Sequence, residues 1–556
     1  MLTIVILFLV GSFLLFFWSS LRHSLLMLQQ NGYFNDRFIR WLRQNPGKMA
    51  NYLLVVTLFF SLFIRNGLAP EIYITANGLL FLVLALLRKK KPEKVPLAFT
   101  WRIRRLLVTI AVLCFLIIQL MASLFWRTFW WELPWIFALM NLLLNAILVL
   151  ANRLNRPLES AIARRFIRDA RRILAEHPGL TVIGITGSFG KTSTKNILDQ
   201  ILRPDFEVLS TPESYNTTLG VVRTIRERLT AAHQVFIVEM GAKKPGDIKE
   251  ICDVVKPSVG VLSSIGEMHL ETFLSMENII NTKFELADAV GQGGLMFLND
   301  DNTFIHGREV SQPVFRYGVV TDGATDGAAH DDAARGDAAT DGAAPDGRAL
   351  DAWAEQITSG PAGSQFTIRF ATGEAVVCRT GLLGKHNVLN IVAAASVAVR
   401  LGVNPHSLAR AVSRLEPVPH RLQLLPPGAK YQIIDDAYNA NPEGAKNALE
   451  ALGSFPGYRV LITPGIVELG EQEEEANRTL GAQAAQNCDY IIFVGRNRSF
   501  PLEEGAKQAG FNRYKIYVAE DIRDALAKAD QLADQLGEGE GPMTVLLEND
   551  LPDQFL

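Results

Sequence analysis

The stretch GITGSFGKTSTK, residues 184–195, combines glycines, a lysine and hydroxyl side chains in the manner of a loop that holds phosphate groups. An apolar segment typical of a strand precedes it at 182–185, and a helical pattern follows it. Backbone N–H groups and the N-terminus of such a helix present positive charge to an anion. We therefore expect Lys191 to reach the β- and γ-phosphates of a nucleotide and the Thr192 hydroxyl to join the shell of a Mg²⁺ ion.

This loop departs from the strict pattern GxxxxGK[ST], because Ile185 stands where the first glycine of that pattern belongs. Its glycines are Gly184, Gly187 and Gly190. A glycine-rich structural turn is therefore the alternative interpretation. The Gly-Lys-Thr sequence between a strand and a helix favours nucleotide binding over that alternative.

Further polar residues follow the apolar strands downstream of the loop. The strand predicted at 235–239 ends on Glu239, at the edge where ligands bind in an open α/β sheet. A carboxylate there suits Mg²⁺, which prefers oxygen ligands. His269 follows the next predicted strand, and Lys283 lies on a predicted helix. Taken singly, His269 would be a structural histidine and Lys283 a surface lysine.

Five apolar runs lie in the first 151 residues, at about 2–20, 51–64, 72–87, 106–125 and 130–151. A helix needs about 20 largely apolar residues to cross the hydrocarbon core, so the first, fourth and fifth runs qualify outright. The second and third runs are shorter and cross only with help from their flanks. A signal peptide is the alternative for the first run, but the run lacks a basic start and a small-residue cleavage site.

Charge in the loops sets the predicted topology. Lys and Arg gather between runs one and two, between three and four, and after run five, whereas Arg65 and Arg127 are alone in the other two loops. Because cytoplasmic loops collect Lys and Arg, we predict about five transmembrane helices in a cell membrane, with the N-terminus outside and the chain after residue 152 in the cytoplasm. Residues 152–179 are predicted to form a basic amphipathic connector.

The membrane region is predicted to anchor the chain in a lipid bilayer. Its spans hold no chain of carboxylates or histidines of the kind that marks an ion pathway, so transport is disfavoured. The formal net charge of −2 argues against a general nucleic-acid partner. Residues 321–351, rich in Ala, Asp and Gly, are predicted to be a disordered surface insert rather than a metal site.

Five ordered motifs resemble the Mur ligase family: TGSFGKTS at 186–193, EMGAKKPGDI at 239–248, HLETF at 269–273, GKHNVLN at 384–390 and DDAYNANP at 435–442. The resemblance covers about 180–556, apart from the insert. Within the family the motifs are most similar to those of the branch that adds D-alanyl-D-alanine to a UDP-linked muramoyl tripeptide. The resemblance implies an ATP-dependent amide ligase, in which a substrate carboxylate becomes an acyl phosphate that an amine attacks.

The resemblance also implies roles for individual residues. Catalytic roles fall on Lys191, Glu239, His269 and Lys283, and Thr192, Glu239, His269 and Lys283 would serve two Mg²⁺ ions, with Lys283 carbamylated. The residues implied in ATP binding are Thr186, Gly187, Ser188, Gly190, Lys191, Thr192 and Ser193 in the loop, His386, Asn387 and Asn390 beside the adenine, and Arg421 and Asp436 at the γ-phosphate and ribose.

The predicted architecture is an α-helical transmembrane region at 1–151, the connector, and two α/β domains. The resemblance implies a phosphate-loop central domain at 180–416 and a Rossmann-like C-terminal domain at 417–556 that closes over ATP. The C-terminal part alternates strands and helices, which means a mostly parallel sheet. Its predicted strands are 431–435, 458–463, 489–494, 515–518 and 543–547, and its predicted helices 443–453, 471–486, 503–510 and 521–536.

Two departures from the family bear on the substrate. Membrane spans stand in place of the soluble domain that grips the UDP-sugar, and in SYNTTLGVVRT, 214–224, Thr217 and Val222 replace a family Asn and Pro. The carboxylate partner is thus a UDP-linked or a lipid-linked peptide precursor, and the amine an amino acid or a dipeptide. A ligase for a polyglutamate-like acceptor and a non-catalytic ATP-binding membrane scaffold are the alternatives.

Overall fold

The computed structural model describes residues 2–45, 69–88, 96–126, 128–212, 215–268, 270–320, 344–426, 428, 430–438, 441–496, 498–536 and 541–549. The chain forms two compact units, Met1–Arg165 and Phe166–Asp550. Each unit is described by itself below.

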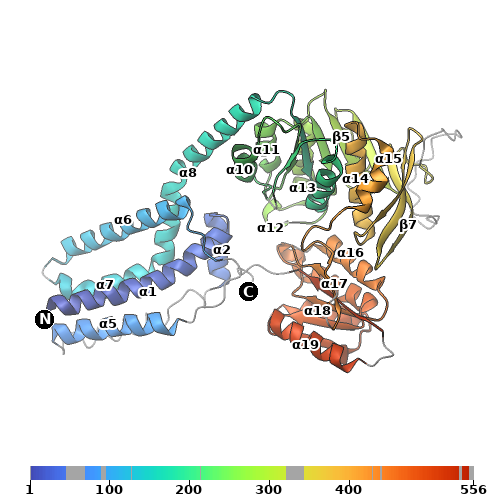
Figure 1. Ribbon diagram of the computed structural model, residues 1–556. Helices are drawn as coiled ribbons and strands as arrows, with labels where there is room; N and C mark the ends of the chain where they lie inside the picture. Colours follow the sequence, from blue (N-terminus) through green and yellow to red (C-terminus); the bar gives the residue numbers. More distant parts are fainter. Residues whose placement is uncertain are drawn as a thin grey trace. The chain divides into compact units, whose positions relative to one another are not determined.

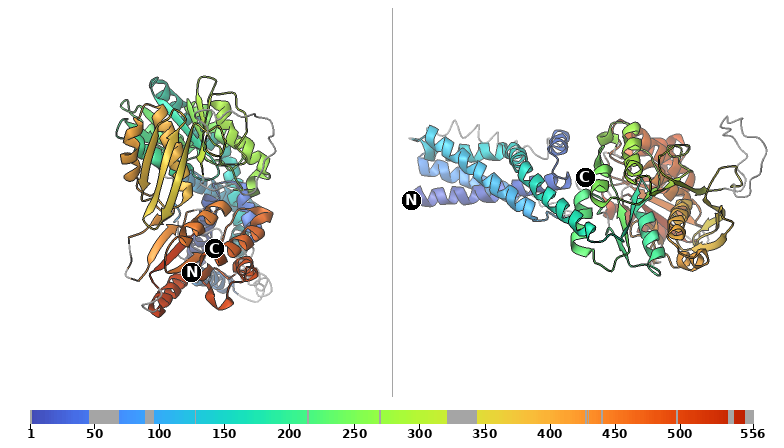
Figure 2. Two further views of the ribbon diagram at one scale, coloured as in Figure 1. Left: turned by 90° about the vertical axis from the view of Figure 1, so that its right-hand side faces the viewer. Right: turned by 90° about the horizontal axis from the view of Figure 1, so that it is seen from above.

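The first unit is helical. Its described helices are α1 (Leu2–Gln30), α2 (Asn35–Gln44), α5 (Pro70–Leu87), α6 (Trp101–Leu124), α7 (Phe129–Leu142) and the first part of α8 (Leu144–Ala175). Helices α1, α5, α6 and α7 run side by side (Figures 1 and 2). Aromatic rings fill the space between them: Phe13 stacks on Phe137 at 4.2 Å and meets Phe81 edge-on at 5.6 Å.

Four of the five predicted apolar runs are helical, and the second run, 51–64, lies outside the described residues. By length and composition α1 and α6 could each cross a membrane, and the pair α7 and α8 makes a third candidate if it is one span broken by a 63° bend. The fifth predicted run is thus broken near Leu143, and the predicted connector continues α8 without interruption. Helix α5 is shorter.

The second unit starts with a large sheet. Its described strands lie in the order β2-β3-β1-β4-β5-β6-β7-β8-β9, parallel from β2 to β7 and antiparallel at β8 and β9. The strands are β1 (Thr181–Thr186), β2 (Val208–Ser210), β3 (Val235–Glu239), β4 (Val259–Leu262), β5 (Leu295–Asn299), β6 (Val314–Val319), β7 (Ala352–Gly360), β8 (Gly363–Phe370) and β9 (Ala375–Thr380). The strands predicted at 182–185, 235–239 and 259–262 are confirmed.

Helices cover both faces of this sheet, α14 and α15 on one side and α10 and α11 on the other (Figures 1 and 2). The helices are α9 (Lys191–Leu202), α10 (Thr218–Arg228), α11 (Asp247–Val255), α12 (Leu270–Phe273), α13 (Met276–Ala289), α14 (Lys385–Arg400) and α15 (Pro405–Ser413). Side chains alternate between two cores, as a strand requires: Ile183 and Ile237 join one, Val182 and Phe236 the other. Glu239 shares the face of Ile237, which is the face that α9 covers.

The C-terminal part carries a second sheet, with strands β10-β11-β15-β12-β13-β14 in order and only β10 antiparallel among the described strands. The elements are β10 (Gln423–Leu424), β11 (Gln432–Asp436), α16 (Pro442–Gly453), β12 (Tyr458–Thr463), α17 (Glu473–Asn487), β13 (Tyr490–Val494), α18 (Ser499–Gln508), β14 (Ile516–Ala519), α19 (Ile522–Gln535) and β15 (Met543–Glu548). Every strand and helix predicted here is confirmed within a few residues, as a parallel Rossmann-like sheet.

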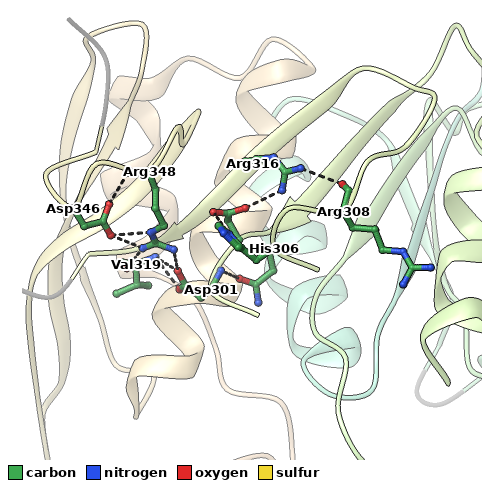
Figure 3. A network of polar contacts seen from close by, with 9 residues as sticks. Asp301, His306, Arg308, Arg316, Val319, Asp346 and Arg348 are labelled. Atoms are coloured by element: carbon green, nitrogen blue, oxygen red, sulfur yellow. Dashed lines mark hydrogen bonds and ion pairs between the residues drawn. The ribbon is translucent and has the colours of Figure 1, made fainter. Parts of the chain in front are cut away.

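The predicted C-terminal boundary of the insert, residue 351, lies too far along the chain. Residues 344–351 are described, and Ala344 and Leu350 are buried against Trp353. Arg348 contacts Asp301 at 2.6 Å and Asp346 at 2.8 Å, and donates to the Val319 carbonyl (Figure 3). Composition alone places this segment in the insert. The residues that bury it and pair with it, among them Trp353 and Asp301, lie outside the segment and cannot be identified from its composition. Residues 321–343 lie outside the described residues.

Candidate active site

The phosphate loop joins β1 to α9 and is held by the segment after β4. Ser263 and Ser264 both donate their hydroxyls to the Phe189 carbonyl, at 2.6 and 2.8 Å. The Ser188 N–H donates to the Ser264 carbonyl at 2.7 Å. Gly187 must be glycine, because a Cβ there would lie 2.1 Å from the Ser263 hydroxyl and 2.9 Å from the Ser264 carbonyl oxygen. These bonds fix the loop in its shape without a ligand.

The N-terminus of α9 lies open for an anion. Gly190 adopts φ 81° at the N-cap, and among the described residues no side chain caps this helix. The first N–H groups of a helix have no partner within it, so they remain free to bind phosphate. A Cβ on Gly190 would lie 2.8 Å from the Asn390 side-chain oxygen, so the backbone and α14 approach closely here.

Lys191 is folded back onto the loop. Its ammonium donates to the carbonyls of Gly187 and Ser188, at 2.8 and 2.9 Å. Burial lowers the pKa of Lys191 to about 8; the charge of Glu239 acts against this shift and that of Arg421 reinforces it. The lysine thus has weak neutral partners that a phosphate oxygen can replace.

Glu239 ends β3 beside α9, as its place in the sequence predicts. One carboxylate oxygen, Oε1, accepts from the Thr192 hydroxyl and from the Asn216 amide, each at 3.0 Å. The other, Oε2, lies 3.1 Å from the Lys195 ammonium, and both side chains are 1% exposed. Burial alone would raise the pKa of Glu239, but the charges of Lys195 and Lys191 lower it, so the carboxylate is ionised.

Sequence reasoning missed Lys195 and Asn216. Lys195 comes four residues after Lys191 on α9, and residues spaced by four lie on the same face of a helix. That spacing was a usable signal. Asn216 precedes α10, and only the folded chain brings it to Glu239.

Lys283 lies buried on α13, 3% exposed. Burial lowers its pKa well below the usual range, and the charge of Lys191 adds to this, whereas Asp247 and Glu285 oppose it. A lowered pKa favours the uncharged amine, the form that carbamylation requires. His269, predicted as a metal ligand, lies outside the described residues, immediately before α12.

The residues predicted beside the adenine lie at the start of α14. The Asn387 amide donates to the Leu383 carbonyl at 2.9 Å, and the Asn390 side-chain oxygen accepts from the Thr194 hydroxyl of α9 at 3.1 Å. Asn390 thereby joins α14 to the phosphate-loop helix. The Nδ1 atom of His386 is buried and has no hydrogen-bond partner within the described chain, and burial lowers the pKa of His386 to about 4.

Two other predicted residues take different places in the loop region. Thr186 is fully buried, and its hydroxyl donates to the Met240 carbonyl at 2.9 Å, so the side chain faces the protein. Ser193 lies in the first turn of α9 and is partly exposed. The structure brings Lys191, Thr192 and Glu239 together, and Lys283 is close enough for the charge of Lys191 to lower its pKa.

The C-terminal sheet contributes Arg421 and Asp436. His420 and Leu422, on either side of Arg421, adopt left-handed backbone at φ 59° and 45°. Two carboxylates hold this bend: Leu422 N–H donates to Asp436 at 3.0 Å, and His420 contacts Asp435 at 2.7 Å. The Arg421 guanidinium lies over the Tyr438 ring, 4.5 Å from its centre.

Asp436 has an acidic neighbour that the motifs did not reveal. Glu548, at the end of β15, pairs with Asp436 across the parallel strands and is 1% exposed. Burial raises the pKa of Asp436 to about 6, and burial together with Asp436 raises the pKa of Glu548 well above its usual range. Burial and the neighbouring acid thus both favour the neutral form of Glu548.

The residues fit a magnesium–nucleotide complex. The glycines let the loop pack closely on the segment after β4 and on α14, α9 offers free N–H groups, and His386 offers an unpartnered ring nitrogen within the described chain. Thr192 and Glu239 supply hard oxygen ligands, and Mg²⁺ is commonly bound by one or two carboxylates together with substrate phosphates. No group of three or more His, Cys, Asp or Glu suited to a metal occurs in the described part of the chain, which does not include His269.

The chain matches known proteins over these two sheets. The model of the Mur ligase middle domain matches residues 185–398, and that of the Mur ligase, glutamate ligase domain matches 420–541. A UDP-N-acetylmuramoyl-tripeptide–D-alanyl-D-alanine ligase of Mycobacterium tuberculosis is 36% identical over 394 residues, which cover 67% of this chain and 72% of that protein.

Solved structures agree with this similarity. MurF from Acinetobacter baumannii is 25% identical with a TM-score of 0.60, covering 70% of this chain and 78% of that chain. MurF from Thermotoga maritima, in complex with ADP, is 25% identical with a TM-score of 0.56, covering 70% of this chain and 80% of that chain.

Proposed function

The chain belongs to the Mur ligase family of ATP-dependent carboxylate–amine ligases, and we propose that it joins an amine to a carboxylate of a peptidoglycan precursor as a membrane-anchored ligase of the MurF type. The observation that carries this proposal is the meeting of Lys191, Thr192 and Glu239 at the carboxyl ends of β1 and β3. That edge of an open α/β sheet is where ligands bind.

The proposed chemistry has two balanced steps. A carboxylate oxygen of the acceptor attacks the γ-phosphorus of ATP, the bond to the bridging oxygen breaks, and ADP leaves. The amine nitrogen then attacks the carbonyl carbon of the acyl phosphate. The C–N bond forms, the C–O bond to phosphate breaks, and the nitrogen loses a proton as inorganic phosphate leaves. Transfer of phosphoryl groups between anions relies on positive charge and positioning.

Each residue has a place in this scheme. Lys191 would move from the loop carbonyls to the β- and γ-phosphates, and Thr192 and Glu239 would hold Mg²⁺, an ion that neutralises charge on phosphates. Lys283, once carbamylated, and His269 would serve a second ion. His386 offers Nδ1 to the adenine side, and Arg421 and Asp436 reach the γ-phosphate and the ribose when the C-terminal domain closes.

The membrane anchor rests on the first unit. Helices α1 and α6 are long and apolar enough to span a bilayer. They carry exposed apolar side chains, Leu7 and Val108 at 65% each, that water would not favour. With the positive loops on the inner side, the N-terminus lies outside and the α/β unit lies in the cytoplasm.

The proposed substrates are D-alanyl-D-alanine, or a similar amine, and a muramoyl peptide. The UDP-linked tripeptide is favoured because the Mycobacterium tuberculosis relative is named for it. A lipid-linked precursor is the second candidate, favoured by the apolar helices that precede the α/β unit. A polyglutamate-like acceptor and a scaffold without catalysis are the remaining alternatives.

The test is acceptor-dependent phosphate release by the full chain in detergent. UDP-muramoyl-tripeptide and a lipid-linked precursor are compared, each with and without D-alanyl-D-alanine, for the wild type, Lys191→Ala and the surface control Lys507→Ala. Turnover on the UDP form, lost only in Lys191→Ala, supports the MurF-type proposal. Turnover on the lipid form alone makes the second candidate correct. No acceptor-dependent turnover with either precursor would refute both.

A further inference from the structure

Lys195 is a buried cation next to the proposed metal ligand Glu239. It lies on α9, is 1% exposed, and holds its ammonium 3.1 Å from Glu239 Oε2. Burial of a charge is costly unless a partner compensates it, so the fold depends on this ion pair being intact. Nothing in the ligase scheme above uses Lys195.

The two oxygens of the Glu239 carboxylate have different environments. Oε2 faces Lys195, whereas Oε1 faces the Thr192 hydroxyl and the Asn216 amide, both at 3.0 Å. Oε2 accepts no hydrogen bond within the described chain, so the Lys195 ammonium acts on it through charge, and Oε1 is the oxygen next to the Thr192 hydroxyl that a metal ion would also take. The ion pair therefore helps to set the orientation of the carboxylate.

The charges near Glu239 also matter for a metal ion. Two ammonium groups, Lys191 and Lys195, act on one carboxylate, and both lower its pKa. The cluster is therefore positive before any ligand arrives. A bare divalent cation meets repulsion, whereas a magnesium–nucleotide complex, which is net negative, meets attraction.

We propose that Lys195 is a positioning residue of the metal site, which holds one oxygen of Glu239 and cancels its charge, so that the site takes up a divalent cation together with nucleotide phosphates and not alone. This inference rests on the proposed function only for the assignment of Thr192 and Glu239 to the metal. It does not depend on which acceptor or amine the enzyme uses.

The probe is Mn²⁺, a spectroscopic substitute for Mg²⁺, titrated into the full chain in detergent with and without ADP, with free Mn²⁺ measured by electron paramagnetic resonance. Wild type is expected to bind Mn²⁺ at this site much more weakly without ADP than with it. Lys195→Met is expected to bind Mn²⁺ alone about tenfold more tightly than wild type, because the ammonium that repels the cation is gone. The coupling between metal and nucleotide is then weaker.

Three further variants locate the effect. Lys195→Arg keeps the charge and is expected to behave as wild type. Lys195→Gln removes the charge but can still donate to Oε2, so it tests the same expectation if the methionine variant fails to fold. The double variant Lys195→Met with Glu239→Gln is expected to bind Mn²⁺ alone less tightly than Lys195→Met, because the Glu239 carboxylate is the group that binds the cation.

Equal Mn²⁺ binding by wild type and both neutral variants without ADP would overturn the inference, as would a gain in Lys195→Arg, which keeps the charge. A loss of equal size with and without ADP would make Lys195 a purely structural residue and also overturn it. These readouts involve no turnover. A chain with the expected Mn²⁺ behaviour but no acceptor-dependent phosphate release would refute the proposed function and leave this inference standing.

Discussion

The two sheets bring opposite charge arrangements to the proposed nucleotide site. On the nine-stranded sheet, Glu239 is compensated by Lys195 and ionised. On the six-stranded sheet, Asp436 lies beside a second acid, Glu548, and the pair keeps a proton. The first arrangement is built from opposite charges. The second places two acids side by side, and its charge changes as the pH rises through about 6.

This difference suggests that the two sheets have different roles: one holds a fixed site and the other changes its charge. The loop side is fixed by buried ion pairs and hydrogen bonds before any ligand binds. The C-terminal side holds Arg421 on a bend with left-handed backbone at both neighbours, and its carboxyl pair can gain or lose a proton. Variants that remove one charge at a time should separate the two behaviours.

The largest effect is expected for Glu239→Ala. Removing the carboxylate takes away the charge that compensates the buried Lys195 ammonium, and breaking one half of a buried pair costs about 3–5 kcal/mol of unfolding free energy. Glu239→Gln combined with Lys195→Met removes both charges and is expected to unfold at a higher temperature than Glu239→Ala. Thermal unfolding of the two variants makes the comparison, and equal midpoints would contradict the view that the pair is mutually compensating.

Lys191→Ala is expected to reduce acceptor-dependent phosphate release by about 10²–10³-fold, the usual cost of losing one group that stabilises charge in a transition state. Its partners in the free chain are two carbonyls, so stability should change little. The rate is measured at saturating ATP, with Lys507→Ala as the surface control. A rate within a factor of two of wild type would remove Lys191 from the proposed role.

Glu548→Gln tests the acidic pair. The raised pKa of Asp436, about 6, means that the stability this pair contributes is present at low pH and is lost as the pH rises through about 6. In the variant one acid is gone and the amide can donate to Asp436. The difference in unfolding free energy between pH 5 and pH 8 should therefore shrink by about 1–2 kcal/mol.

Unfolding midpoints across this pH range, with the exposed control Glu450→Gln, measure the effect. The wild type and the control should show the same pH dependence, and Glu548→Gln a flatter one. A variant as steep as the wild type would show that the pair does not share a proton.

The smallest effect is expected at the base of the insert. Arg348→Ala removes the contacts to Asp301 and Asp346, which are partly exposed, and should cost about 1 kcal/mol. ADP binding should not change, because this network (Figure 3) shares no residue with the phosphate loop. Calorimetry of ADP binding checks this, and a large loss of affinity would connect the insert to the site.

Sequence alone predicted the elements that local pattern determines. The strands β1, β3 and β4 and every strand of the C-terminal sheet except β10 follow from apolar runs, and Lys191, Thr192 and Glu239 meet where the motifs place them. Contacts between distant segments were beyond that reasoning. Glu548 lies outside the motifs that carry the resemblance, and only the register of β11 with β15 reveals its partner Asp436.

Burial was equally hard to read from the sequence. The burial of Lys195 follows from the packing of β3 against α9, which the sequence of α9 does not show. Arg348 lies in a segment of low complexity, where composition predicts exposure. The bend between α7 and α8 breaks a run that is apolar over most of its length. In each case tertiary packing decides the outcome.

The central claim is that ATP activates a carboxylate of the acceptor. It is tested most directly by giving the enzyme UDP-muramoyl-tripeptide with ¹⁸O in its terminal carboxylate, together with ATP and D-alanyl-D-alanine, and measuring the released phosphate by mass spectrometry. An acyl phosphate requires one ¹⁸O atom to appear in each phosphate. Phosphate that carries oxygen only from ATP and water would mean that ATP is hydrolysed without activating the acceptor, and would contradict the account.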